Sequence, residues 1–186
     1  MTRIRTRSGR SRTTAELGDR QSPNSKRTHV TQPTIPSDGS NSPFYELSLE
    51  ESRALLARSY VGRIAFSVGT RVDIEPMSFI YDEGWLFGRT SLGTKLHALG
   101  HRPWVAFEVD EVEGPFDWRS VVVHGSFHVL EPEGSEYDTG IYLRATERLQ
   151  AAIPEYGTPD DPGAFRTTMF GIHMTELVGR GARTRR

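Results

Sequence analysis

The chain has 186 residues, enough for one domain of ordinary size, and its hydrophobic content of 35% is low for a chain folded along its whole length. It contains no cysteine, which excludes disulfide bonds, thiolate catalysis and zinc–thiolate sites. No apolar run approaches the ~20 residues that a membrane-spanning helix needs. The N-terminus lacks the apolar core of a secretory signal, so we expect a cytoplasmic protein without a membrane anchor.

Charge divides the chain into three parts. Residues 1–43 hold eight Lys or Arg and three acids, residues 44–179 hold 11 basic and 21 acidic residues, and residues 180–186 add four Arg. Because the first part has almost no apolar spacing, little there offsets the entropy of ordering it. We predict a disordered basic arm over 1–43, a folded domain over 44–179 and a loose basic tail over 180–186. Acids within the arm, and its lack of interleaved aromatic residues, argue against nucleic-acid binding.

The folded part begins with a helix followed by two strands. Ser48 and Glu51 form a capping box that predicts a helix over 48–59. Apolar alternation then predicts strands over 60–68 and 72–81. Pro76 lies in the middle of the second strand and cannot donate a ladder hydrogen bond, so that strand has an edge or a break there. Backbone groups near Met77 and Ser78 could then face a ligand.

A strand from Trp85 leads into a helix over 94–100 through a polar junction. This junction carries the hydroxyls of Thr90, Ser91 and Thr94 and the ammonium group of Lys95, the single lysine outside the basic arm. Free amide groups at a helix start, together with hydroxyls and an ammonium group, make a phosphate-binding arrangement. A capped surface helix after a hairpin explains the same spacing equally well.

The rest of the chain completes an order of αβββαββαβ. We predict strands over 104–112, 120–130 and 166–178, a helix over 135–152, and a β-bulge or a close approach at Gly125. Six strands with short connections favour a closed or nearly closed antiparallel barrel flanked by helices. Such a barrel is too narrow to hold a ligand inside, so a cofactor would lie outside it or between subunits.

Several other chemistries find little support. His97 and His101 have the i,i+4 spacing of metal ligands, but no third ligand has an obvious spacing, and we predict no metal site. His124 and His128 share a strand face that we interpret as a solvated or interface surface. A nucleophile elbow, a dinucleotide-binding fingerprint and a Walker motif are all missing from the sequence. Trp118-Arg119-Ser120 either closes the barrel end or offers stacking and anion pairing to a planar ligand.

Taken together, these motifs resemble the FMN-binding split-barrel family of pyridoxamine 5'-phosphate oxidase-like and nitroimidazole-resistance-type flavoproteins. The resemblance covers residues 46–181 and rests on five segments in order. These are Val-Gly-Arg-Ile-Ala-Phe (61–66), Pro-Met-Ser-Phe-Ile (76–80), Phe-Gly-Arg-Thr-Ser-Leu-Gly-Thr-Lys-Leu (87–96), Trp-Arg-Ser-Val-Val-Val-His-Gly (118–125) and a closing strand from Phe-Gly-Ile-His (170–173) to Val-Gly-Arg (178–180).

The resemblance implies a mainly β fold with flanking helices, a six-stranded antiparallel split β-barrel, and a homodimer with FMN between its subunits. It places the flavin ring along the backbone of Pro76, Met77, Ser78 and Phe79. The phosphate would contact Thr90, Ser91, Thr94 and Lys95, with Arg89 lining the same site, while Trp118, Arg119 and Ser120 approach from the partner chain.

One departure from the family concerns the substrate. The pyridoxamine phosphate oxidases proper carry a C-terminal signature of a Trp and spaced Arg residues, whereas Arg180 and Arg183 follow the last strand without that Trp. We therefore expect an FMN-dependent oxidoreductase acting on another small or planar molecule. Two alternatives remain: the same fold binding deazaflavin or haem, with His124, His128 or His173 near the metal, and a non-enzymatic ligand-binding protein.

Overall fold

The computed structural model describes residues 42–91 and 93–184, apart from the side chains of Thr94 and Lys95. The chain divides into two units, Met1–Thr34 and Ile35–Arg186, and every described residue belongs to the second. The predicted disordered arm therefore lies outside the described residues, except for its last two positions.

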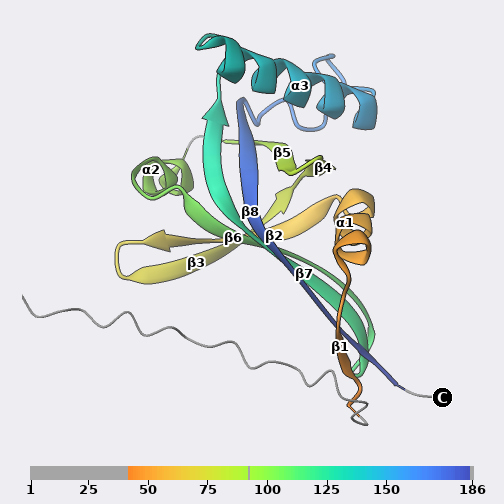
Figure 1. The fold of residues 1–186 in the computed structure, drawn as a ribbon. Coiled ribbons are helices and arrows are strands. Elements are labelled where there is room, and N and C mark those ends of the chain that lie inside the picture. The colour runs from red at the N-terminus through yellow and green to blue at the C-terminus, as the bar shows by residue number, and fades with distance from the viewer. Residues whose placement is uncertain (1–41, 92, 185–186) are drawn as a thin grey trace, which may run out of the picture. The chain divides into compact units, whose positions relative to one another are not determined.

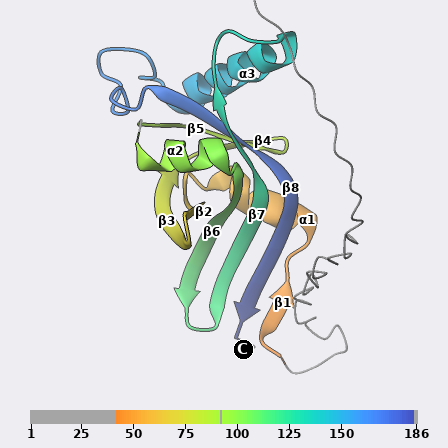
Figure 2. The same ribbon diagram turned by 90° about the vertical axis from the view of Figure 1, so that its left-hand side faces the viewer.

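The described residues of this unit form one antiparallel sheet with three helices (Figures 1 and 2). The elements are β1 (Phe44–Glu46), α1 (Leu49–Arg58), β2 (Val61–Val68), β3 (Arg71–Ser78), β4 (Ile80–Asp82), β5 (Trp85–Thr90), α2 (Thr94–His101), β6 (Trp104–Gly114), β7 (Asp117–Leu130), α3 (Glu136–Ala152) and β8 (Thr168–Arg183). The strand order is β3-β2-β6-β7-β8-β5-β4, with β1 paired to β8. The six predicted strands are all present, and β1 and β4 are two short additions.

The curled sheet is a split barrel and not a closed one, because its two end strands, β3 and β4, do not pair with each other in the described part of the chain. At the seam between them, β3 approaches β5 without a described ladder. A Cβ atom placed on Gly88 would lie 2.6 Å from the carbonyl oxygen of Ser78 and 2.6 Å from the ring of Phe170. Since real Cβ atoms do not approach other atoms so closely, a glycine is needed here. Packing on Gly88 closes the seam.

Pro76 lies on an edge strand, as predicted. In the described part of the chain, β3 pairs with β2 alone, and Pro76 faces Arg63 across that ladder. The predicted strand over 72–81 does break, but at Phe79, whose amide donates to the carbonyl oxygen of Tyr60 (3.0 Å). The proline therefore marks the free edge, and the break follows three residues later.

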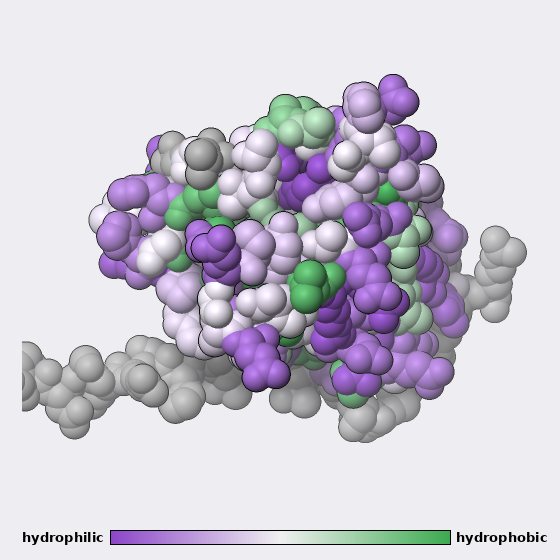
Figure 3. Space-filling model, turned by 90° about the horizontal axis from the view of Figure 1, so that it is seen from above, coloured by the Kyte–Doolittle hydropathy of each residue, from purple (hydrophilic) through white to green (hydrophobic). Residues whose placement is uncertain are grey.

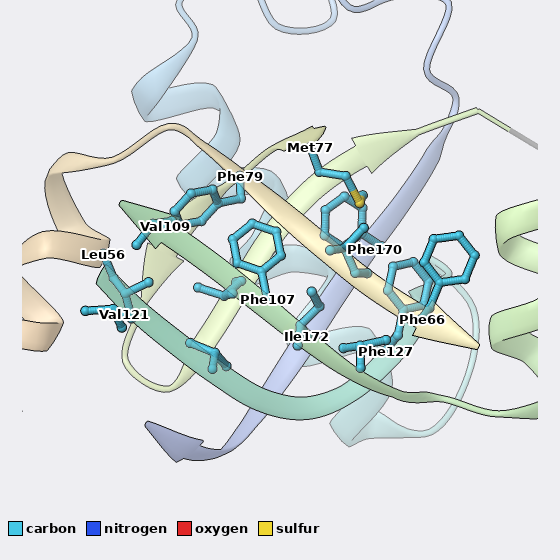
Figure 4. Packing of buried hydrophobic residues seen from close by; sticks show 14 of the residues in the cluster. Leu56, Phe66, Met77, Phe79, Phe107, Val109, Val121, Phe127, Phe170 and Ile172 are labelled. Atoms are coloured by element: carbon cyan, nitrogen blue, oxygen red, sulfur yellow. The ribbon is translucent and has the colours of Figure 1, made fainter. Parts of the chain in front are cut away.

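The core fills the inside of the curled sheet, with α1 packed against it. Figure 4 shows several of its aromatic rings gathered between the strands. Leu55 and Leu56 of α1 are fully buried, and the capping box forms: Ser48 N–H donates to Glu51 Oε2 (2.8 Å) and Glu51 N–H to Ser48 Oγ (3.1 Å). The alternating residues of the strands form the rest of the core, including Ile64, Phe66, Phe79, Phe107, Val109, Val121, Val123, Phe127, Phe170 and Ile172.

Strands β6 and β7 form a long hairpin that turns at Pro115 and Phe116, so both strands extend closer to the turn than the predicted ranges 104–112 and 120–130. The register of β7 against β8 shifts between His124 and Gly125, which confirms the predicted irregularity there. In Figures 1 and 2 the turn of this hairpin lies at the opposite end of the sheet from α3.

The prediction of a loose tail from residue 180 is wrong for residues 180–183. Strand β8 continues to Arg183, paired on one side with β7 and on the other with β1. A Cβ atom on Gly179 would lie 2.2 Å from Ser52 Oγ, and one on Gly181 would lie 2.6 Å from the ring of Tyr45. Glycine at these two positions permits close packing of the end of β8 against α1 and β1.

Helix α3 covers the other end of the sheet and forms a second, smaller core with β5 and β8. Ser135 caps the helix by accepting from the amide of Asp138 (3.2 Å). Its outer surface is mostly hydrophilic in the view from above (Figure 3), with hydrophobic side chains isolated among polar ones. The second core consists of Trp85, Phe87, Ala145, Leu149 and Met169.

Candidate functional site

A cavity of about 460 Å³ lies at the barrel seam, beside the last turns of α3 and the segment over 153–167. Backbone and side chains of Ser78, Phe79 and Gly88 line it from the seam, and Leu149 and Ile153 line it from the helix end. Pockets of this size with mostly apolar walls and a few polar groups are typical of small-molecule sites. The seam therefore opens onto a space suited to an organic ligand.

Arg89, at the end of β5, lines this cavity but is held by a carboxylate. Its Nη1 and Nη2 atoms donate to Asp161 Oδ2 and Oδ1 at 2.6 and 2.7 Å, and its guanidinium carbon lies 4.4 Å from the ring centre of Tyr156. The Asp161 side chain is 1% exposed and that of Arg89 13%. Two parallel bonds in a buried setting fix the guanidinium group in one orientation.

Asp161 also ties the loop after α3 together. Its carboxylate accepts from the amides of Gly157 (3.0 Å) and Gly163 (2.8 Å) besides the two bonds from Arg89. The bonds from Arg89, followed by that from the Gly157 amide, hold the pKa of Asp161 well below its usual range. Arg89 therefore anchors the loop that forms one wall of the cavity.

Arg166 gives the cavity its remaining positive charge. Its guanidinium carbon lies 5.4 Å from the ring centre of Phe165, and both residues line the cavity. Among the described residues, no carboxylate pairs with Arg166. An anionic group entering the cavity would therefore meet one neutralised guanidinium group and one that is free to bind it.

The structure brings together three of the twelve predicted site residues, Ser78, Phe79 and Arg89, around this cavity. The Met77 side chain points into the core, and the Pro76 ring is exposed on the edge strand. The Thr90 side chain is buried at the end of β5, and Ser91 is exposed directly after it.

The predicted phosphate-binding segment leads from β5 to the start of α2. Thr94 is the first residue of this helix, but its side chain and that of Lys95 lie outside the described residues. Gly93 occupies the N-cap position and makes no side-chain cap hydrogen bond. Amides of the first helical turn therefore lack that form of capping. Their use by a phosphate group stays a prediction.

Comparison with known proteins identifies the family. The family model described as pyridoxamine 5'-phosphate oxidase matches residues 48–181, most of the described chain. The chain belongs to this family. None of the curated proteins matches the chain.

Three of the solved structures that resemble this family member are described as FAD-binding or haem-binding proteins. A FAD-binding protein from Mesorhizobium loti is 24% identical with a TM-score of 0.60, covering 75% of this chain and 99% of its own. The FAD-binding protein from Mycobacterium smegmatis is 25% identical with a TM-score of 0.52, covering 73% and 98%. A haem-binding protein from Mycobacterium smegmatis is 19% identical with a TM-score of 0.55, covering 73% and 55%.

The remaining predicted residues of this pyridoxamine 5'-phosphate oxidase family member lie on the β6–β7 hairpin and do not line the cavity of their own chain. Arg119 pairs with Glu111 (3.1 Å), and Ser120 Oγ donates to Glu108 Oε1 (2.9 Å). The Trp118 ring lies 6.2 Å from that of Phe44. The resemblance implies that these three residues approach the flavin site of a partner chain, and this stays a prediction.

The described residues also bear on metal binding and on membrane-spanning helices. His97 and His101 are exposed and stack edge to face with ring centres 5.0 Å apart. No group of three or more His, Cys, Asp or Glu within residues 42–184 is placed to hold a metal ion, as far as these residues are described. No described helix is both long and apolar enough to cross a membrane.

Sequence reasoning missed Asp161, Tyr156 and Arg166. The segment Thr-Pro-Asp-Asp-Pro-Gly (158–163) predicts a loop, and nothing in it distinguishes Asp161 from Asp160. Only the fold shows that one carboxylate turns inward to a guanidinium group 72 residues away in the chain.

Proposed function

We propose that this family member binds FMN at a homodimer interface and transfers electrons to or from a small or planar substrate. The observation that carries the proposal is the position of the cavity, at the barrel seam beside the residues that the family resemblance assigns to the flavin. In that position the free edge of β3, from Pro76 to Ser78, offers backbone groups that β2 does not use.

The residues around the seam are suited to a flavin. Ile80 and Phe165 offer apolar contact to a planar ring system. The hydroxyl of Ser91 and the helix start at Gly93 offer donors for a phosphate group. The sequence adds the hydroxyl of Thr94 and the ammonium group of Lys95 as predicted phosphate ligands.

A bound flavin supplies hydride and electron transfer, and the protein's share is to bind, orient and shield. Arg89, fixed by Asp161, keeps the loop over 157–163 in place as one wall of the cavity. Leu149 and Ile153 limit the access of water from the helix side. None of the described side chains is proposed as a catalytic acid or base.

Exposed apolar residues support dimerisation. The strands β2, β3 and β6 carry outward-facing hydrophobic side chains that are more than 60% exposed. Large exposed apolar areas are typical of protein–protein interfaces. In the proposed dimer, Trp118, Arg119 and Ser120 of one subunit approach the flavin of the other. The exposed residues are Val61, Val72, Ile74, Trp104 and Val112.

The test is an absorbance spectrum of the purified protein and an FMN titration of two variants. We expect an oxidised-flavin spectrum, and an FMN affinity reduced about 10- to 100-fold in Lys95→Ala because a phosphate-binding charge is lost. Lys26→Ala removes the other lysine of the chain and serves as the control with unchanged affinity.

A colourless protein that does not bind FMN would contradict the proposal. Titrations with a deazaflavin and with haem would then follow, because both are ligands that the same fold was expected to hold. Light scattering at several concentrations tests the dimer separately from the cofactor. A monomer that binds FMN would leave the cofactor assignment intact and remove the shared site.

A further inference from the structure

A second cavity, of about 410 Å³, lies at the other end of α3. Strands β7 and β8 line it, together with Trp85 of β5, the segment over 131–133 and the first turns of the helix. It shares no lining residue with the cavity at the seam. None of the twelve residues that the resemblance assigns to the flavin lines it.

Aromatic rings form its base. The Trp85 ring stacks on Phe87 with centroids 5.7 Å apart and planes 9° apart. The imidazole rings of His173 and His128 lie against the same indole, at 4.8 and 5.7 Å. The largely exposed Tyr137 ring adds a further aromatic wall from α3. Faces of such rings attract cations through their quadrupole.

The charges around this cavity are negative. Glu131, Glu133 and Asp138 line it, and none of its lining residues is Lys or Arg. Burial, followed by the neighbouring His173, lowers the pKa of His128, although Asp138 opposes the shift. This shift favours the neutral form of the His128 imidazole, whose Nε2 lies 2.8 Å from Ser126 Oγ.

We propose that this cavity binds an organic cation, an ammonium group carried on an aromatic or aliphatic body. The body would lie against Trp85 and Ile141, and the ammonium group would lie between the Tyr137 ring and the carboxylates at the rim. An anionic ligand would meet three carboxylates. A metal ion would lack a described set of three ligands.

The experiment is calorimetric titration of the full-length protein with benzyltrimethylammonium, with benzyl alcohol as the neutral aromatic probe and benzoate as the anionic one. We expect the cation to bind at least about tenfold more tightly than benzyl alcohol, and benzoate not to bind. Because the readout is heat and not flavin absorbance, its result is independent of whether FMN binds.

Two variants locate the binding. The double substitution Glu131→Gln and Glu133→Gln removes two charges at the rim of the cavity and is expected to lower the affinity for the cation about tenfold. Glu147→Gln with Glu155→Gln removes two exposed charges that line neither cavity, and should change the affinity less than twofold. Tyr137→Leu keeps an apolar side chain but removes the aromatic ring, and is expected to lower the affinity for the cation about 2- to 5-fold.

Three results would overturn the proposal. The first is that benzyltrimethylammonium does not bind at concentrations up to about 10 mM, which corresponds to a negligible affinity. The second is that benzyl alcohol binds as tightly as the cation. The third is that both pairs of glutamate substitutions weaken cation binding equally. Since all four glutamates are exposed, neither pair of substitutions is expected to unfold the protein.

Discussion

The two cavities share a scaffold but differ in the sign of their charge. Strand β5 contributes Gly88 and Arg89 to the seam cavity and Trp85 to the second cavity. Helix α3 lines both, the seam cavity with its last turns and the second cavity with its opening turns. The segment before α3 brings carboxylates, whereas the segment after it brings Arg166. The connections on either side of one helix thus determine which charge each cavity prefers.

The two cavities also differ in how their polar groups are held. In the seam cavity, the bond pair between Arg89 and Asp161 is nearly buried and fixes the loop. In the cavity beside Trp85, Glu131 and Glu133 are exposed and free to move toward a ligand. The first cavity is therefore built into the stability of the fold, while the second can be altered at the rim at little cost.

The largest effect is expected from Gly88→Ala, which breaks the seam that carries the first cavity. The new Cβ would lie 2.6 Å from a backbone carbonyl oxygen, so the substitution should lower the free energy of unfolding by about 3 kcal/mol. Chemical denaturation measures it. Gly140→Ala on α3 meets nothing within 4 Å and should instead stabilise by about 0.5–1 kcal/mol. Equal effects of the two substitutions would contradict the packed seam.

Asp161→Asn should have the next largest effect, because it leaves Arg89 unpaired and turns an amide group toward donors. We expect the Tm at pH 7 to fall by roughly 5–10 °C, while the exposed neighbour Asp160→Asn changes it by less than about 2 °C. Thermal melts of both variants measure the difference.

The stability that the Arg89–Asp161 pair contributes depends on pH in a defined direction. The folded pKa of Asp161 is depressed, so its stabilising contribution is complete above the unfolded pKa of about 4 and is lost as the pH falls below it. The gap in Tm between the wild type and Asp161→Asn should therefore be constant from pH 7 to about 5 and shrink below about 4. A gap that closes already near pH 6 would assign the effect to another group.

Arg166→Gln sharpens the contrast in charge between the two cavities. We expect the FMN affinity to fall about fivefold, because a guanidinium group without a described carboxylate partner is lost, and benzyltrimethylammonium binding to stay the same. Arg53→Gln, at an exposed position on α1, is the matched control. Loss of both affinities would mean that the cavities are not independent.

The smallest effect concerns His128 in the second cavity. Its pKa is lowered in the folded state, so the unfolded chain takes up the proton first, and the wild type loses stability as the pH falls below about 6.5. His128→Asn removes this loss. We expect the Tm difference between pH 7 and 5.5 to shrink by roughly 1–2 °C in the variant. If the Tm of the variant depended more strongly on pH than that of the wild type, the loss of stability could not be assigned to His128.

Local patterns in the sequence predicted most of the fold. The capping box at Ser48, the alternation of the six long strands and the irregularity at Gly125 depend on neighbours in the chain, and each was confirmed. The end of the last strand was not predicted. The four arginines of residues 180–186 suggested a loose basic tail, and only the fold shows that residues 180–183 pair with β1 and β7.

The candidate site was less predictable because its contacts connect distant parts of the chain. The family resemblance led to Ser78, Phe79 and Arg89, but nothing near Arg89 in the sequence announces Asp161. The second cavity shows the same limit. His128 was interpreted as surface and is exposed, but only the antiparallel pairing of β7 and β8 shows that it lies beside His173 and Trp85.

The pairing of β1 with the end of β8 has a mechanical consequence. Phe44 faces Ala182 in antiparallel register, so the chain enters β1 and leaves β8 at the same end of this strand pair. A force applied to these two ends would load the hydrogen bonds between the strands one pair at a time, like a zipper, instead of all together in shear. We therefore expect this domain to yield at low tension when stretched end to end, with β1 detaching first.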